Sequence, residues 1–252
     1  MFQLPLPRTD QDYLRGFAGI FPSPGEAEQY LYDSWERMQI VLMWLQQLEQ
    51  SKVHRVLELG ANPYFLTLLI RKYFDFDLQL ANYFGNSADN GNRVQTVERN
   101  GETHDFPYSH FNVEIDPFPY ETGSFDCVIF CEILEHLVLN PDRTISEIKR
   151  VLRPAGFLML STPNAARLGN FIKLMKGQSI YDGYSSHGIY GRHNREYTFS
   201  EVQALMHKHG FEPVQSEVRN IYPHPLRSRL LQSLRPKVWY EHLFFLSRSV
   251  QQ

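Results

Sequence analysis

VLELGANPYFLT, at residues 56–67, joins an apolar run to an amphipathic segment through an acidic residue and a glycine. This pattern predicts a β-strand near Arg55–Leu59, a tight turn at Gly60 and a helix over Tyr64–Phe74. In a parallel α/β sheet, the crevice at the carboxyl end of the first strand is where a nucleotide-like ligand binds. We therefore expect the loop after Leu59 to be a ligand-binding loop.

The rest of the chain alternates strand-like and helix-like segments. Further strands are expected at Leu78–Tyr83, Tyr108–Val113, Phe125–Cys131, Gly156–Ser161, Phe211–Val218 and Trp239–Leu246, and helices at Pro141–Leu152 and Phe199–His209. This alternation predicts an α/β fold with a doubly wound, Rossmann-like, mostly parallel sheet of seven strands. The dipeptide Asn100-Gly101 lies between two strand-like runs, which predicts a β-hairpin insertion near residues 93–106.

Two parts of different composition divide the chain. Residues 1–50 are expected to form an irregular arm up to Pro22 and then a long helix, which starts with a capping box at residues 23–26. This helix either packs on the core or forms a lid. Residues 51–252 are expected to form the main domain. Within it, the Tyr-, Gly- and His-rich segment at about 170–197 is expected to be a substrate-recognition loop rather than a simple packed surface loop.

Composition narrows the function classes. The 252 residues carry a formal net charge of −3, so the overall charge gives no argument for nucleic acid or an anionic membrane as partner. Cys127 and Cys131 lie four apart on an expected strand, about 13 Å between Cα atoms, which is too far for a disulfide. We therefore expect a reducing, cytoplasmic location. No secretory leader and no run of membrane-spanning length is visible.

The ligand loop lacks the glycines that a dinucleotide requires. A G-x-G-x-x-G fingerprint lets the backbone approach a pyrophosphate, but only Gly60 is present, with Asn62 and Tyr64 near the other positions. The carboxylate of Glu58 would repel a pyrophosphate and would suit a ligand with an ammonium or sulfonium group. Electrostatics therefore favours S-adenosylmethionine over NAD and argues against a dehydrogenase.

Four motifs occur in the order known from one large enzyme family. They are Glu58–Asn62 after the first strand, Phe125–Ile129 as F-D-x-V, Arg150–Gly156 as R-x-L-K-P-G-G with one alanine, and Ser161–Asn164 as S-T-P-N. Together they show that the sequence resembles class I S-adenosylmethionine-dependent methyltransferases over about residues 53–218.

The resemblance implies a set of cofactor-binding residues. They are Glu58, Gly60, Ala61, Asn62, Asn82, Asn112, Val113, Glu114, Cys131 and Glu132. In the family, an acid after the second strand binds the ribose hydroxyls, and here that position is Asn82. An amide can still bond a diol but without charge assistance.

A fifth motif, E-x-x-E-H at residues 132–136, follows the fourth of the predicted strands. It resembles the metal-binding segment of ubiquinone-pathway O-methyltransferases and of small-RNA 2′-O-methyltransferases. In the RNA enzymes, a later histidine completes the metal site. His193 is the nearest match to that histidine and His187 is the other candidate. Glu132, Glu135, His136 and His193 are thus expected ligands of Mg²⁺, Mn²⁺ or Zn²⁺.

The alternative to a metal is that these side chains act alone. Without an ion, His136 or His193 would be the general base for an acceptor hydroxyl, beside Glu135. In either case the reaction is a direct displacement at the sulfonium methyl, and positioning supplies most of the catalysis.

The leading functional hypothesis is O-methylation of a small polar acceptor such as a sugar, a glycan precursor or a polyol. Arg192 and Arg195 are suited to a phosphate or carboxylate on that acceptor. RNA 2′-O-methylation is a second hypothesis, which the net charge disfavours although Arg227–Lys237 holds four basic residues. A non-catalytic S-adenosylmethionine-binding module is the third, because the glycine motif is reduced.

Overall fold

A computed structural model describes residues 4–17, 24–85, 90–99, 101–185, 188–221 and 236–250. The chain forms two compact units, Met1–Asn112 and Val113–Gln252. In the part of the chain so described, no helix is long and apolar enough to cross a membrane.

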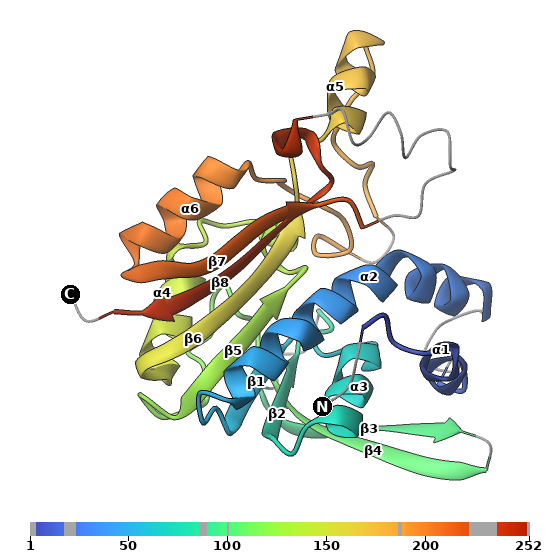
Figure 1. The fold of residues 1–252 in the computed structure, drawn as a ribbon, viewed down its shortest axis with the longest axis vertical. Coiled ribbons are helices and arrows are strands. Elements are labelled where there is room, and N and C mark those ends of the chain that lie inside the picture. Colours follow the sequence, from blue (N-terminus) through green and yellow to red (C-terminus); the bar gives the residue numbers. More distant parts are fainter. Residues whose placement is uncertain are drawn as a thin grey trace. The chain divides into compact units, whose positions relative to one another are not determined.

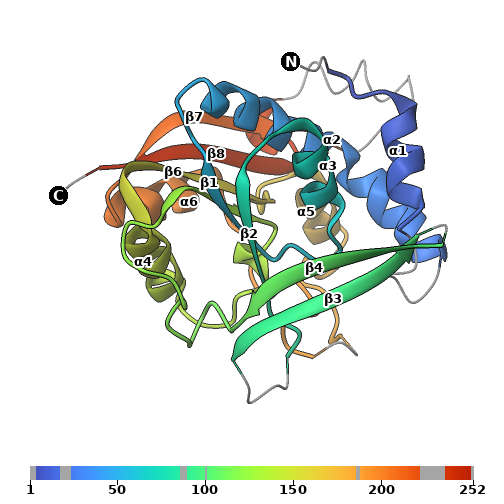
Figure 2. The same cartoon turned by 90° about the horizontal axis from the view of Figure 1, so that it is seen from below.

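The first unit contains three helices and four strands among its described residues. They are α1 (Arg8–Arg15), α2 (Pro24–Glu49), β1 (Arg55–Leu59), α3 (Phe65–Tyr73), β2 (Asp77–Asn82), β3 (Gly91–Arg99) and β4 (Glu102–His110). The strand order is β3-β4-β2-β1, in which β1, β2 and β4 run parallel and β3 is antiparallel to β4. Figure 2 shows β3 and β4 as a long hairpin, which confirms the predicted insertion.

The core of the first unit follows from the apolar periodicity of its elements. Four consecutive residues of β1, Val56–Leu59, are buried, and α3 buries Leu68, Leu69 and Ile70. The long helix α2 packs on α1 and α3 and buries Leu42. The predicted strand, turn and helix around residues 56–67 are therefore confirmed.

The arm at the start of the chain was expected to be irregular, and this expectation is wrong for α1. Leu14 and Phe17 are buried, and the buried carboxylate of Asp10 accepts hydrogen bonds from Lys72 and Tyr73 of α3. Tertiary contacts thus fix a helix that has no clear periodicity of its own. The predicted capping box at residues 23–26 includes Ser23, which lies outside the described residues.

The second unit contains the other described elements. They are β5 (Phe125–Cys131), the 3₁₀ helix η2 (Leu134–His136), α4 (Asp142–Val151), β6 (Leu152–Pro163), α5 (Leu168–Met175), α6 (Phe199–Lys208), β7 (Phe211–Arg219), the 3₁₀ helix η3 (Lys237–Trp239) and β8 (His242–Ser249). The strand order is β5-β6-β8-β7 (Figure 1). Because β8 is antiparallel to both neighbours, β5, β6 and β7 run in one direction, and the β7 pairing shifts register between Pro213 and Gln215.

The fold class is confirmed as α/β with a mostly parallel, Rossmann-like arrangement, since three of the four described strands in each unit share a direction. The described residues hold eight strands instead of seven. The hairpin accounts for the difference, because the strand predicted at Tyr108–Val113 is the end of its second strand, β4. Cys127 and Cys131 are free thiols, as expected.

Of two helices in the second unit, the local sequence predicts α6 but not α5. The predicted capping box of α6 is present, with Thr198 and Glu201 bonding each other's backbone N–H groups. In contrast, α5 begins at Leu168 and continues to Met175, so it occupies the start of the segment 170–197, which the sequence predicts to be a loop.

Candidate active site

The loop after β1 is held to the end of β2 by backbone and side-chain bonds. Gly60 has a φ of 67°, a left-handed conformation that glycine adopts readily. The N–H groups of Gly60 and Ala61 donate to the carbonyl of Ala81 at 2.8 and 3.3 Å. The N–H of Asn62 donates to Oδ1 of Asn82 at 2.8 Å. One glycine therefore suffices for this loop, because β2 fixes its first three residues.

Tyr64 supports the same loop from within the first unit. Its ring is buried and stacks on Phe106 with 4.2 Å between centroids. Its hydroxyl donates to Oε1 of Gln95 at 2.9 Å and accepts from Nδ2 of Asn82 at 3.0 Å. Asn82, predicted as the ribose ligand, thus stabilises the loop. Its side-chain oxygen can still accept one further hydrogen bond. Tyr64 and Gln95 were not predicted as site residues, since only the fold brings them together.

Glu58 is a buried carboxyl group at the end of β1. Its Oε2 accepts a hydrogen bond from Oγ1 of Thr67 at 2.6 Å. Burial raises the pKa of Glu58 to about 8, and the bond from Thr67 and the charge of Arg71 only partly oppose this. A positively charged ligand near the carboxyl would favour its ionised form. The chemistry of this position therefore fits a cofactor with an ammonium or sulfonium group.

Two residues predicted to contact adenine have structural bonds within the second unit. Oε1 of Glu114 accepts hydrogen bonds from the backbone N–H groups of Val138 and Leu139 at 2.7 and 2.6 Å. The carbonyl of Val113 accepts from Oγ1 of Thr144 at 3.0 Å. These bonds fix the start of the second unit to the segment that follows η2. Asn112, which was predicted with them, is buried at the end of the first unit.

Glu132 follows Cys131 directly after β5 and has a φ of 56°. Its Oε1 accepts from Oγ of Ser161 at 2.6 Å, and its Oε2 accepts from Nε2 of His242 at 2.9 Å. Both partners are buried. Strands β6 and β8 thus hold the carboxylate of Glu132 by both oxygens.

Three of the four predicted metal ligands come together in the second unit. Ligand atoms of Glu135, His136 and His193 all lie within 4.8 Å of one another. Glu132 is not in this group, because its carboxylate is bonded to β6 and β8. The other candidate, His187, lies outside the described residues. We call Glu135, His136 and His193 the EHH cluster.

Glu135 contributes a fully buried carboxyl group to the EHH cluster. Its Oε2 accepts from Oγ1 of Thr162 at 2.9 Å, whereas its Oε1 is buried with no hydrogen-bond partner in the described part of the chain. Burial, followed by the charge of Glu132, raises the pKa of Glu135 to about 8. One oxygen of this side chain is therefore left for a cation or for a hydroxyl group.

His136 is held in one tautomer. Its Nδ1 lies 2.9 Å from the carbonyl oxygen of Arg192, and a carbonyl only accepts, so Nδ1 carries the hydrogen. In the neutral ring, the lone pair is then on Nε2. Burial lowers the pKa of His136, and the neighbouring His193 lowers it further, so this ring is neutral at pH 7. The two rings are 5.0 Å apart between centroids.

His193 has an acidic partner, Glu196, that was not predicted as a site residue. Nδ1 of His193 lies 3.5 Å from Oε1 of Glu196, and this bond raises the pKa of the imidazole. Burial favours a neutral Glu196, but His193, Arg167 and Asn170 outweigh it and lower the pKa of Glu196 to about 2. Arg167 and Asn170 contact its Oε2 at 2.5 and 2.8 Å. Only its position three residues after His193 pointed to this role.

The two arginines that were expected to bind an anion differ in their surroundings. Arg195 forms an ion pair with Glu201 at 2.8 Å. Arg192 bonds the amide oxygen of Asn194 at 3.0 Å, and its guanidinium lies 4.5 Å from the ring centroid of Tyr184. Among the described residues no ion pair of Arg192 occurs. Arg192 is therefore the better candidate for an anionic group on the acceptor.

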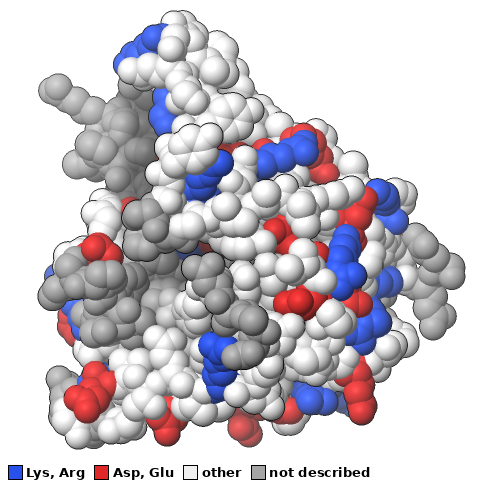
Figure 3. Space-filling view, turned by 180° about the vertical axis from the view of Figure 1, so that it is seen from behind, with Lys and Arg blue, Asp and Glu red and all other residues white. Residues whose placement is uncertain are grey.

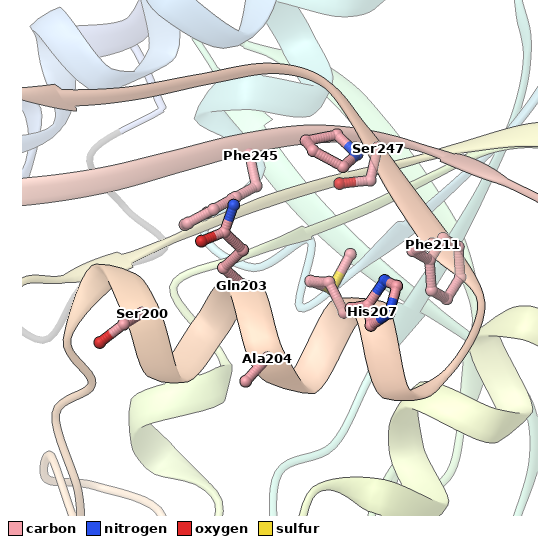
Figure 4. Close-up of a pocket in the computed structure, with 9 residues that line it drawn as sticks. Ser200, Gln203, Ala204, His207, Phe211, Phe245 and Ser247 are labelled. Atoms are coloured by element: carbon pink, nitrogen blue, oxygen red, sulfur yellow. The ribbon is translucent and has the colours of Figure 1, made fainter.

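A groove of about 320 Å³ lies elsewhere in the second unit, between α6 and strands β7 and β8 (Figure 4). Phe211 and Phe245 form its apolar wall, and Gln203, His207 and Ser247 supply its polar groups. None of its residues belongs to the EHH cluster. The groove offers no grouping of acid and base comparable to that cluster.

The comparison with known families decides the class of protein. Residues 32–216, more than half of the chain, match a family described as a methyltransferase domain. The chain belongs to this methyltransferase family. No curated protein sequence matches the chain significantly.

Solved structures agree with the fold. A SAM-dependent methyltransferase from Archaeoglobus fulgidus superposes with a TM-score of 0.54 at 11% identity, covering 88% of this chain and 99% of the other. The CMeT domain of the citrinin polyketide synthase gives a TM-score of 0.54 at 15% identity, covering 94% of this chain and 60% of the other. The chain thus shares the fold of a SAM-dependent methyltransferase, which is the fold that the sequence motifs predicted. An enzyme is favoured over the non-catalytic module.

Proposed function

We propose that this methyltransferase methylates a hydroxyl oxygen of a small polar acceptor, such as a sugar, a glycan precursor or a polyol, at the EHH cluster. The observation that carries the proposal is the way the cluster is held. One polar atom of each side chain has a partner: Thr162 bonds Glu135, the carbonyl of Arg192 bonds His136, and Glu196 contacts His193. The other polar atom of each side chain is left for a substrate or an ion. Such fixed side chains can orient an oxygen nucleophile.

The two histidines have pKa values shifted in opposite directions, which suits an acid–base pair. His136, with its lowered pKa and its lone pair on Nε2, is the general base that takes the proton from the acceptor hydroxyl. His193, with its raised pKa, stays protonated nearer neutrality and stabilises the developing negative charge on that oxygen. The cofactor supplies an electrophilic methyl group on a sulfonium. We assign its methionine part to Glu58 and Gly60 and leave the other predicted contacts as part of this proposal.

A divalent cation would fit the same cluster. Glu135 offers a buried oxygen without a hydrogen-bond partner in the described chain, and both histidines have an acceptor behind the ring, as metal ligands usually do. One oxygen and two imidazole nitrogens suit Mn²⁺ or Zn²⁺ better than Mg²⁺. Such an ion would lower the pKa of a bound hydroxyl. In that case His136 and His193 would be ligands rather than the base and the charge stabiliser.

The test is a methyl-transfer screen with labelled S-adenosylmethionine and sugar nucleotides, glycans, quinol precursors and RNA ends as acceptors. With the acceptor so found, His136→Ala and Glu135→Gln should lower turnover by about 10²- to 10⁴-fold. Cofactor affinity should stay within about threefold, because neither residue is assigned to the cofactor. His207→Ala, an exposed histidine of α6, is the matched control.

Three outcomes would contradict parts of this proposal. Full activity in both variants would exclude the EHH cluster as the reaction site. Transfer to RNA alone, with a steep salt dependence, would replace the small acceptor by a nucleic acid. If dialysis against a chelator leaves turnover unchanged, the histidines act without a metal, whereas recovery with Mn²⁺ would make them ligands.

A further inference from the structure

Helix α5 leaves large apolar side chains in water. The exposed fractions of Phe171, Ile172, Leu174 and Met175 are 56%, 42%, 57% and 73%. Every residue from 171 to 179 is exposed, so this part of the helix and the turn after it have no covered face. Scattered apolar side chains on a surface are ordinary, but four within five residues form a patch that usually contacts something.

The stretch of sequence that carries this patch has charges of one sign. Lys173 and Lys176 lie within and directly after α5, and no acidic residue occurs from Ala166 to Tyr181. Figure 1 shows α5 projecting past the ends of the strands of the second unit. From behind, its tip is white with blue at the edge (Figure 3). The overall charge of −3 hides this local excess of positive charge.

We propose that α5 docks on the surface of an anionic lipid bilayer. The four apolar side chains would enter the boundary between head groups and acyl chains, and the two lysines would lie at the level of the lipid phosphates. At 3.6 residues per turn, the four apolar side chains share one broad face of α5, and Lys173 lies on the opposite side. A broad apolar face with lysines beside it, on a projecting tip, is typical of a helix that lies in the interface of an anionic bilayer. With eight residues, α5 is far too short to cross the bilayer.

A short chain of bonds joins α5 to the proposed acceptor site. Asn170, in the first turn of α5, is buried, and its Nδ2 donates to Oε2 of Glu196 at 2.8 Å. Glu196 in turn contacts His193 of the EHH cluster. If the proposed function holds, the docked helix brings the EHH cluster to hydroxyl groups at the membrane surface. The sugar or polyol of the proposed function would then be the polar head group of an amphiphile, which carries the acceptor hydroxyl while its apolar part lies in the bilayer.

Vesicle flotation of the full chain tests the docking without knowledge of the acceptor. Vesicles of phosphatidylcholine alone are compared with equimolar phosphatidylcholine and phosphatidylglycerol. The wild type should float with the anionic vesicles. The double variant Phe171→Ser/Met175→Ser should bind at least about tenfold more weakly, and Lys173→Gln/Lys176→Gln should lose the dependence on anionic lipid. Val214→Ser, which removes an apolar side chain that is 53% exposed on β7, should bind as the wild type does.

Two results would overturn the docking. One is a wild type that floats with neither kind of vesicle. The other is a Phe171→Ser/Met175→Ser variant that floats as well as the wild type. If that variant keeps lipid binding but loses a concentration-dependent dimer, α5 is a contact between copies of the chain instead.

Failure of the docking and failure of the proposed function can be told apart. Phe171→Ser/Met175→Ser should keep transfer to a water-soluble acceptor, because neither side chain is in the EHH cluster. In contrast, His136→Ala should float normally and lose transfer. Thermal melting of each variant confirms that it is folded.

Discussion

Glu58 in the first unit and Glu135 in the second are alike in almost every local respect. Both are buried, both accept a hydrogen bond from a threonine hydroxyl, Thr67 at 2.6 Å and Thr162 at 2.9 Å, and burial raises both pKa values to about 8. They differ in the charges nearby. Arg71 opposes the rise at Glu58, whereas the acidic Glu132 adds to it at Glu135 and a histidine opposes it.

This difference indicates what each carboxyl group can bind. Glu58 lies in β1, just before a loop whose backbone N–H groups are bonded to β2, so it can bind a cationic ligand by charge alone. Glu135 lies beside two nitrogen ligands whose other ring atoms are occupied, so it can share an ion or a proton with them. Burial thus raises the pKa of both carboxyl groups to about 8, although Glu58 is suited to a cationic ligand and Glu135 to an ion or proton shared with histidines.

The largest expected effect is on the pH dependence of stability. A carboxyl whose folded pKa is about 8, above its unfolded value, favours the folded state at low pH and penalises it as pH rises from about 4.5 to 8. Between pH 5 and pH 9, each of these carboxyl groups should lower the free energy of unfolding by on the order of a few kcal/mol. Glu58→Gln and Glu135→Gln should each remove one such loss. Urea unfolding at both pH values measures this.

The same experiment can break the similarity of the two sites. If Mn²⁺ binds the EHH cluster, it should stabilise the wild type and Glu58→Gln at pH 9 but not Glu135→Gln. If both Gln variants lose as much stability with pH as the wild type does, neither carboxyl group titrates near pH 8 and the comparison fails.

A smaller effect concerns proton release on cofactor binding. At pH 7 Glu58 is mostly protonated, and the ammonium group of S-adenosylhomocysteine should favour its carboxylate. Binding should therefore release up to about one proton, and affinity should rise about tenfold from pH 6 to 8. Calorimetry in buffers of different ionisation enthalpy measures the release. Glu58→Gln should abolish it, and Glu135→Gln should retain it. Equal release in all three proteins would move the titrating group away from Glu58.

The smallest effect sharpens the role of the two threonines. Thr67→Val and Thr162→Val each remove the hydroxyl that bonds one buried carboxyl group. Each should lower the free energy of unfolding by about 1 kcal/mol near neutral pH. Glu58 should show the larger rise in pKa, because its bond is shorter, and NMR titration of labelled Glu carboxyl carbons would detect it. An unchanged pKa in both variants would show that the threonine hydroxyls do not help to set these pKa values.

Much of the fold could be predicted because local patterns are sufficient for it. The apolar strands, the Asn-Gly hairpin and the Thr198–Glu201 capping box depend on residues close in sequence. The hairpin's second strand and the strand predicted at Tyr108–Val113 were counted separately, because a continuous strand has no marker at the join. Helix α5 is not predicted from the sequence because it is short, contains Gly169, ends just before Gly177 and has no buried apolar face.

The candidate site could be predicted only in part. Glu135, His136 and His193 were assigned together from a motif, and the fold brings their ligand atoms within 4.8 Å. Glu196 and Gln95 could not be chosen over other polar residues, since their partners are distant in sequence or in an irregular loop. Glu132 belongs to the motif but bonds β6 and β8, a choice that depends on how strands pair.

The register shift at Pro213 has a consequence for self-association. Strand β7 ends the order β5-β6-β8-β7, and Pro213 has no N–H to offer to a further strand. The irregularity between Pro213 and Gln215 interrupts the row of backbone donors and acceptors that an extended edge would present. This edge is therefore a poor template for adding a strand from another copy. Edge-to-edge aggregation through β7 is disfavoured as a result.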